Sequence, residues 1–258
     1  MKIVNVELPE LPEDKNVCIA LSGGLDSTTL VHVLVEAYGK DRVKALSFDY
    51  GQRNVKELEM ATKTAQSLDI YHDIIKLEYL GKIAKDVSSL VADSDLKPES
   101  VKDASGDPQP STYIPYRNAQ FAFITAAFAE SNDCKYIFNA TNATDIYGYW
   151  DTTEEFKESI NNVLKLNRKN QLEFVAPFVE FYKEDELLVA KELMKKYGNF
   201  LENTWSCYNG DLGSGKECGE CNTCREKITG YINAGFEDDI ILSKFNINQE
   251  ELNAIKDL

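Results

Sequence analysis

The sequence predicts an α/β fold: a doubly wound, mainly parallel sheet with helices on both faces. Short apolar runs alternate with longer helical ones in the order β-α-β-α-β and then α-β, which is the pattern of a parallel sheet with crossover helices. The chain has 258 residues and 43% hydrophobic content, enough to bury a sizeable core. No apolar run approaches the roughly 20 residues that a membrane span needs, so we expect no membrane association.

The predicted elements follow one another closely along the first half of the chain. Strands are expected over NVCIAL (16–21), VKALSFDY (43–50), YHDIIKLEYL (71–80) and KYIFNAT (135–141). Helices are expected over STTLVHVLVEAYG (27–39), NVKELEMATKTAQSLDI (54–70) and RNAQFAFITAAFAESND (117–133). Ligands of such sheets bind in the crevice at the carboxyl ends of the strands. The polar stretches SGGLDS, SFDYGQ and NATNATD all lie at such ends.

The chain divides into a large domain and a small C-terminal segment. We expect the α/β domain to cover residues 1–200 and a helical segment to cover 201–258. Within the domain, residues 82–111 include KPESVKDASGDPQPS, which is rich in Pro, Ser and Asp. That composition predicts a flexible surface insertion.

Net charge limits the choice of partner. Asp and Glu number 43 against 28 Lys and Arg, so 43 − 28 leaves a net charge of −15. Such a surface repels phosphate backbones, and we expect no nucleic-acid partner. A polyphosphate ligand would have to be held by local dipoles, a few placed cations and metal. The N-terminal MKIVNVELPE lacks a signal-peptide pattern, so we expect a cytoplasmic protein.

The stretch ALSGGLDSTT (20–29) is a candidate phosphate site. Gly23 and Gly24 let the backbone approach a ligand, and the N–H groups at the start of the next helix favour an anion. Ser22, Ser27 and Thr28 can add hydroxyl donors. No Lys follows the glycines, so this is not a GxxxxGK[ST] loop. The alternative is an ordinary strand-to-helix turn capped by Asp26 or Ser27.

Four of the six cysteines form a candidate metal site. Cys207, Cys218, Cys221 and Cys224 have the spacing C-x10-C-x2-C-x2-C, which is typical of tetrahedral zinc. An iron–sulfur cluster is an alternative, as are buried free thiols. Disulfides are disfavoured in a cytosolic chain. Cys18 and Cys134 are interpreted as packing residues.

These motifs together resemble a known family. SGGLDS resembles the pyrophosphate loop of the ATP pyrophosphatase superfamily, whose sheet is of the adenine nucleotide α-hydrolase-like type. The further pieces SFDYGQRNVKELE, YIPYRN, NATNATDIYGYWDTTEEF, APFVEFYKEDE and the four-cysteine segment resemble, in order, the 7-cyano-7-deazaguanine synthase family. The resemblance covers nearly the whole chain, and SFDYGQ and the cysteines are its most specific parts.

The resemblance implies a carbon–nitrogen ligase with a two-stage reaction. ATP with magnesium activates the carboxylate of 7-carboxy-7-deazaguanine, ammonia gives an amide, and a second activation lets the amide lose water to a nitrile. Each activation releases AMP and pyrophosphate. A carboxylate needs activation because it is a poor acceptor for ammonia. No glutamine-hydrolysing domain is visible, so the nitrogen donor is expected to be free ammonia. The resemblance also implies a homodimer, queuosine-type biosynthesis and a structural zinc.

The resemblance assigns roles to particular residues. The catalytic set it implies is Ser22, Asp26, Ser27, Arg117 and Lys183, with Asp26 as a magnesium ligand or water organiser. ATP would be bound by Leu21, Ser22, Gly23, Gly24, Asp26, Ser27 and Thr28, and its adenosine by Asp49, Tyr50 and Gln52. The deazaguanine acid would be bound by Tyr113, Arg117, Asn118, Asp145, Tyr147, Tyr149 and Trp150.

The chain also departs from the family pattern. The family usually has glycine where Tyr116 stands, and proline, cysteine and arginine where Trp150, Thr152 and Thr153 stand. One rival function is therefore the adenylation and amidation of a different carboxylate, on a small molecule or a protein. Another is an RNA-modifying ligase or thiolase of the same superfamily. A zinc-stapled module that binds ATP without turnover is the non-enzyme rival.

Overall fold

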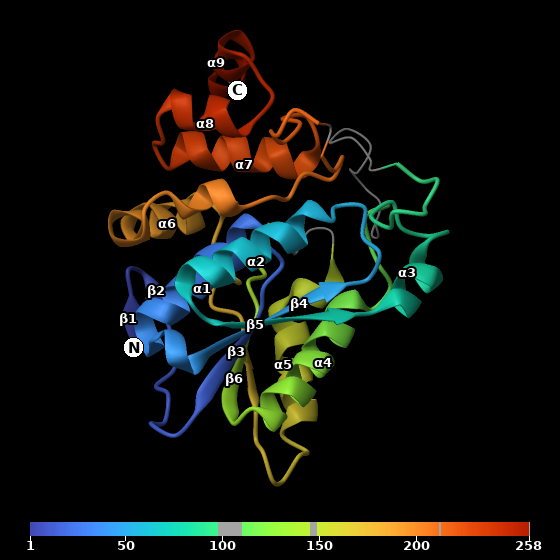
Figure 1. The fold of residues 1–258 in the computed structure, drawn as a ribbon, viewed down its shortest axis with the longest axis vertical. Helices are drawn as coiled ribbons and strands as arrows, with labels where there is room; N and C mark the ends of the chain where they lie inside the picture. The colour runs from blue at the N-terminus through green and yellow to red at the C-terminus, as the bar shows by residue number, and fades with distance from the viewer. Residues whose placement is uncertain (98–109, 145–148, 212, 258) are drawn as a thin grey trace.

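A five-stranded parallel sheet forms the centre of the molecule (Figure 1). The computed structural model describes residues 1–97, 110–144, 149–211 and 213–257. The strands lie in the order β5-β4-β3-β6-β7, and every pair is parallel. Their bounds are β3 (Asn16–Ala20), β4 (Val43–Asp49), β5 (Tyr71–Lys76), β6 (Cys134–Phe138) and β7 (Glu173–Val175). This confirms the predicted mainly parallel sheet.

Helices cover both faces of the sheet. One face packs α1 (Leu25–Tyr38), α2 (Lys56–Leu68) and α6 (Lys183–Tyr197), and the other packs α3 (Glu78–Ala84), α4 (Arg117–Ser131) and α5 (Glu154–Leu164). Successive side chains of β3 point to opposite faces of the sheet and so join both apolar cores. Val17 and Ile19 pack in the core on the first face, and Cys18 packs in the core on the second. The doubly wound arrangement is therefore confirmed.

The C-terminal segment packs on the first helical layer. It contains η4 (Phe200–Asn203), α7 (Asn222–Asn233), α8 (Asp238–Lys244) and α9 (Gln249–Lys256), and these last three helices lie above α6 in Figure 1. Ile228 and Tyr231 of α7 belong to the same apolar core as Leu187 of α6. A Cβ on Gly230 would lie 2.9 Å from Cγ of Lys183, so the missing side chain lets α7 approach the start of α6 closely.

The structure adds short elements that the sequence pattern does not predict. These are the antiparallel pair β1 (Lys2–Ile3) and β2 (Val6–Glu7), and the 3-10 turns η1 (Lys40–Arg42) and η3 (Trp150–Thr152). Each has two or three residues, which is too few to show a period. The strand expected over 71–80 ends at Lys76, because α3 begins at Glu78.

Part of the segment 82–111 is packed against the rest of the domain. Ser88, Ser89 and Val91 are buried, and Val91 pairs with Gln52 in an isolated bridge. Residues 98–109 of this segment lie outside the described residues. Among the described helices, none is long and apolar enough to cross a membrane.

Candidate active site

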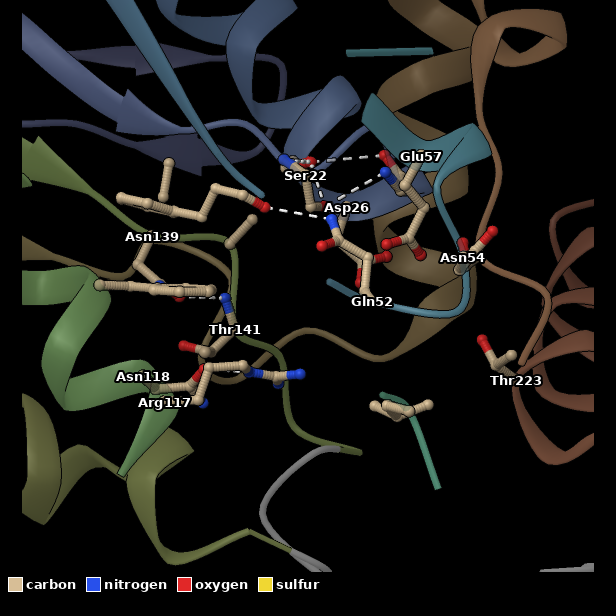
Figure 2. Close-up of a pocket in the computed structure, with 18 of the residues that line it drawn as sticks. Ser22, Asp26, Gln52, Asn54, Glu57, Arg117, Asn118, Asn139, Thr141 and Thr223 are labelled. Carbon is tan, nitrogen blue, oxygen red and sulfur yellow. Dashed lines mark hydrogen bonds between the residues drawn. The ribbon is translucent and has the colours of Figure 1, made fainter. Parts of the chain in front are cut away.

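A pocket of about 280 Å³ lies at the carboxyl ends of β3, β4 and β6 (Figure 2). Its wall includes Ala20 at the end of β3, Phe48 near the end of β4, and Asn139 directly after β6. This is the edge of the sheet where the sequence analysis expects a ligand. The pocket therefore joins segments that are far apart in the chain.

The SGGLDS loop forms one end of the pocket and is held by its own serines. The Ser22 and Ser27 hydroxyl oxygens lie 3.0 Å apart, and the Gly24 N–H donates to Ser22 Oγ at 3.2 Å. Helix α1 begins at Leu25, and its N-cap residue Gly24 has no side-chain cap. A turn capped by Asp26 or Ser27, the alternative interpretation, is not what is observed. The first N–H groups of α1 are instead available to an anion.

Gly23 brings helix α2 against this loop. Its φ is +86°, a conformation that residues with a side chain rarely adopt. A Cβ at this position would overlap the carbonyl oxygen of Glu57 and lie 2.8 Å from the amide nitrogen of Ala61. The glycine therefore serves two purposes, since it makes the turn and lets the loop rest on the backbone of α2.

Asp26 and Lys183 form an ion pair at the pocket. Lys183 Nζ lies 2.5 Å from Asp26 Oδ1, and Asn142 Nδ2 donates to Asp26 Oδ2 at 3.4 Å. Burial is the largest influence on Asp26 and alone would raise its pKa, but Lys183, Glu186 and Lys227 together outweigh it and the pKa is lowered. Lys183 is 6% exposed and also lies 3.6 Å from Glu186. The pair thus keeps a carboxylate and an ammonium ion fixed beside the loop.

The C-terminal segment supplies a second cation to the pocket. Lys227 of α7 donates to Ser206 Oγ at 3.2 Å and pairs with the buried carboxylate of Glu217. Lys227, Ser206 and Thr223 all line the pocket. Ser206 Oγ would lie 3.5 Å from a Cβ on Gly24, so this segment borders the loop directly.

Arg117 and aromatic rings form the opposite wall. Arg117 begins α4, and its Nε donates to Asn118 Oδ1 at 3.3 Å. Phe48 stacks on Phe121 with ring centroids 4.2 Å apart. Gln52 donates to the carbonyl oxygen of Phe48 at 3.1 Å, which fixes the chain just beyond β4. The Arg117 guanidinium thus lies beside the flat apolar surface of aromatic rings on this side of the pocket.

Most of the predicted site residues meet at this pocket. Those that line it are Leu21, Ser22, Gly24, Asp26, Ser27, Tyr50, Gln52, Arg117, Asn118, Tyr149 and Lys183. Those placed off its wall are Gly23, Thr28, Asp49, Tyr113 and Trp150. Thr28 is fully buried within α1, and Asp49 accepts from the Gly51 N–H at 3.2 Å. Asp145 and Tyr147 lie outside the described residues.

The residues that depart from the family pattern mostly serve local structure. Tyr116 has a φ of +54°, which glycine adopts without strain, and its ring packs edge-on against Trp150 at 5.4 Å. Trp150 Nε1 donates to the hydroxyl of Tyr113 at 2.9 Å. Thr153 caps α5 by accepting from the Phe156 N–H at 3.1 Å. Thr152 alone of the four departures lines the pocket.

Several pocket residues are missed by sequence reasoning. They are Asn54, Glu57, Asn139, Thr141, Ser206, Tyr208, Thr223, Glu226 and Lys227. Asn139 and Thr141 could have been predicted from the sequence, because they belong to a polar stretch at the end of a strand, where ligands bind. Others, such as Lys227, read as ordinary helix residues and reach the pocket only through the packing of α7 on α6.

The four cysteines form a compact buried cluster. Their sulfur atoms all lie within 4.8 Å of one another, and those of Cys218 and Cys224 are 3.8 Å apart. Tetrahedral zinc with Zn–S bonds of about 2.3 Å requires S···S separations of about 3.8 Å, so the donor set fits one zinc ion. Cys18 and Cys134 are buried in the other core, as predicted for packing residues.

A family model and several curated relatives agree on the family of this chain. A family model described as "Queuosine biosynthesis protein QueC" matches residues 16–235. The 7-cyano-7-deazaguanine synthase of Thermoplasma volcanium is 34% identical over 90% of this chain and 92% of its own length. That of Picrophilus torridus is 37% identical over 87% and 90%. That of Caldicellulosiruptor bescii is 38% identical over 86% and 95%.

Proposed function

Because this chain belongs to the QueC family, we propose that it is a 7-cyano-7-deazaguanine synthase of queuosine biosynthesis. The reaction is the conversion of 7-carboxy-7-deazaguanine and ammonia to the nitrile, with two molecules of ATP cleaved to AMP and pyrophosphate. The observation that carries the proposal, beside the family, is the uncapped SGGLDS loop with the Asp26–Lys183 pair beside it.

The loop and its cations suit the activation step. When the substrate carboxylate attacks the α-phosphate of ATP, negative charge grows on the leaving pyrophosphate. Donors that are already in place stabilise that charge without reorganising, and such stabilisation is often the largest catalytic contribution. Ser22, Ser27 and the first N–H groups of α1 would supply hydrogen bonds. Lys183 and Lys227 would supply positive charge that the acidic surface as a whole cannot.

The nitrogen chemistry then follows in the same pocket. Ammonia attacks the acyl carbon of the adenylate, AMP leaves, and a proton is released as the amide forms. A second ATP adenylates the amide oxygen with release of pyrophosphate, and loss of AMP and of both N–H protons leaves the carbon–nitrogen triple bond. One pocket must therefore hold first the acid and then its amide in the same position relative to ATP.

Two metal ions accompany this proposal. Cys207, Cys218, Cys221 and Cys224 would hold a structural zinc, because four protein ligands leave no open coordination position for chemistry. Their sulfur spacing favours a single ion over a [4Fe–4S] cluster, in which each thiolate binds a different iron and the cysteine sulfurs lie farther apart. Mg²⁺ carried with ATP would neutralise charge on the phosphates, and Asp26 would be the carboxylate that holds it.

The proposal extends to the substrate class, the location and the oligomeric state. A net charge of −15 supports a small-molecule substrate over a nucleic acid. A cytoplasmic homodimer is proposed from family resemblance.

Mass spectrometry of a panel of acids tests the assignment. The purified protein is incubated with ATP, Mg²⁺, ammonium and each acid, and AMP and the acid-derived product are quantified together. The proposal predicts AMP with the deazaguanine acid and a product carrying a nitrile. AMP formation with a different acid, and none with the deazaguanine, would instead identify an enzyme that amidates another carboxylate.

A further inference from the structure

A carboxylate and an amide that the phosphate chemistry does not use lie together on the pocket wall. Glu57 belongs to the first turn of α2, Asn54 lies just before the helix, and both line the pocket. In Figure 2 they lie across the pocket from Arg117 and Asn118. Contact between Gly23 and the backbone of Glu57 fixes this turn beside the SGGLDS loop, so its side chains neighbour the place where ATP reacts.

Asn54 has a buried amide group whose hydrogen-bonding capacity the described part of the chain does not fill. The residue is 7% exposed, and neither its Nδ2 nor its Oδ1 has a described partner at full hydrogen-bond geometry, although its amide acts on the neighbouring Glu57 carboxylate and lowers the pKa of that group. Buried polar side chains nearly always have a partner, and unsatisfied ones require an explanation. Because Asn54 borders the pocket, a ligand in the pocket is the natural partner.

Glu57 is a carboxylate that no described cation pairs with inside 4 Å. Desolvation is the largest influence on it and raises its pKa to about 8. Arg117 from α4, Lys227 from α7 and the Asn54 amide act in the opposite direction without reversing the shift, while Glu217 raises the pKa further. A desolvated carboxylate of this kind gains stability when a ligand brings N–H donors to it.

We propose that Glu57 and Asn54 bind the hydrogen-bonding edge of the deazaguanine base. This inference rests on the proposed function. The base presents two adjacent donors, a ring N–H and an exocyclic amino group, which match the two oxygens of one carboxylate. Its ring carbonyl oxygen, next along the same edge, accepts from the Asn54 amide. An adenine-type edge offers an acceptor where the ring N–H stands and leaves the carboxylate unsatisfied, so the two residues also select the substrate.

The test compares two substrates in matched variants. One substrate is 7-carboxy-7-deazaguanine, and the other is its analogue without the exocyclic amino group. The variants are Glu57→Gln and, as control, Glu59→Gln, which removes a charge from the exposed side of the same helix where Glu59 pairs with Lys63 at 2.7 Å. We measure kcat/KM for each substrate, and the dissociation constant of each without ATP, by calorimetry.

The wild type should prefer the amino-bearing acid at least about tenfold, as expected for a site built to accept its hydrogen bonds. Glu57→Gln should lower kcat/KM for that acid at least about 100-fold and remove most of the preference, because an amide offers one acceptor and one donor. Asn54→Ala should weaken both substrates by a similar factor, since both keep the ring carbonyl. Glu59→Gln should match the wild type.

Two results would overturn the inference. If Glu57→Gln lowers kcat for both substrates while their dissociation constants and preference stay at wild-type values, the carboxylate acts in proton transfer and does not read the base. If Glu57→Gln has wild-type constants throughout, neither role holds. A wild-type protein that neither binds nor converts the deazaguanine acid would remove the proposed function itself, and that result is distinct from both.

Discussion

Replacing Gly23 by alanine tests whether the loop must touch the backbone of α2. Two costs are expected. A side chain at a φ of +86° costs about 1–2 kcal/mol, and a Cβ that overlaps the Glu57 carbonyl oxygen forces a shift that typically costs a further 1–3 kcal/mol or so. The free energy of unfolding should therefore fall by about 2–5 kcal/mol.

Gly39 offers a matched control for the first cost. Its φ is also +86°, but a Cβ there would meet nothing within 4 Å. Gly39→Ala should thus lose only about 1–2 kcal/mol. Urea unfolding, followed by circular dichroism at several urea concentrations, gives both values if the m-values stay unchanged. Equal losses in the two variants, or full ATP turnover in Gly23→Ala, would refute the contact on which this description of the loop depends.

Three further predictions concern charge, metal and pH. Lys183→Ala leaves the Asp26 carboxylate without its cation, so AMP release should fall at least about 100-fold. The control variant Lys195→Ala, on the exposed side of α6, should leave the rate of AMP release unchanged. Cys221→Ser should lower bound zinc, measured by atomic emission, together with thermal stability; full zinc occupancy would contradict the assignment. The N–H donors of the base bind only the ionised form of Glu57, and the pKa of this carboxyl group is about 8. The affinity for the deazaguanine acid should therefore rise with pH up to about 8 and then level off. The same pH profile in Glu57→Gln would exclude Glu57 as the source of the pH dependence.

The fold could be predicted from the sequence because its central elements are long and periodic. The strands that form β3, β4 and β6 and the helices α1, α2 and α4 begin or end within a few residues of the predicted bounds. Strand β7 has only three residues and carries no period of its own. The conformation of Tyr116 could also be predicted, since a glycine at this place in the family pattern indicates the positive φ that the structure has there.

The site could be predicted only where its residues lie in one motif. SGGLDS places Ser22, Asp26 and Ser27 together by local geometry alone. Lys227 and Ser206 join them through the packing of the C-terminal segment, which depends on contacts remote in sequence such as Gly230 against α6. Asn54 and Glu57 were within a quoted motif, but the burial of the Asn54 amide beside the pocket is a property of the folded chain.

We propose that one pocket turns the deazaguanine acid into a nitrile through two adenylations. Incubation of the protein with 7-carboxy-7-deazaguanine, ATP, Mg²⁺ and ¹⁵N-ammonium, followed by mass spectrometry, tests it directly. We expect a nitrile that carries the ¹⁵N label, an amide that rises and then falls, and two AMP for each nitrile formed. ADP and phosphate in place of AMP and pyrophosphate, or labelled amide that never becomes nitrile, would contradict it.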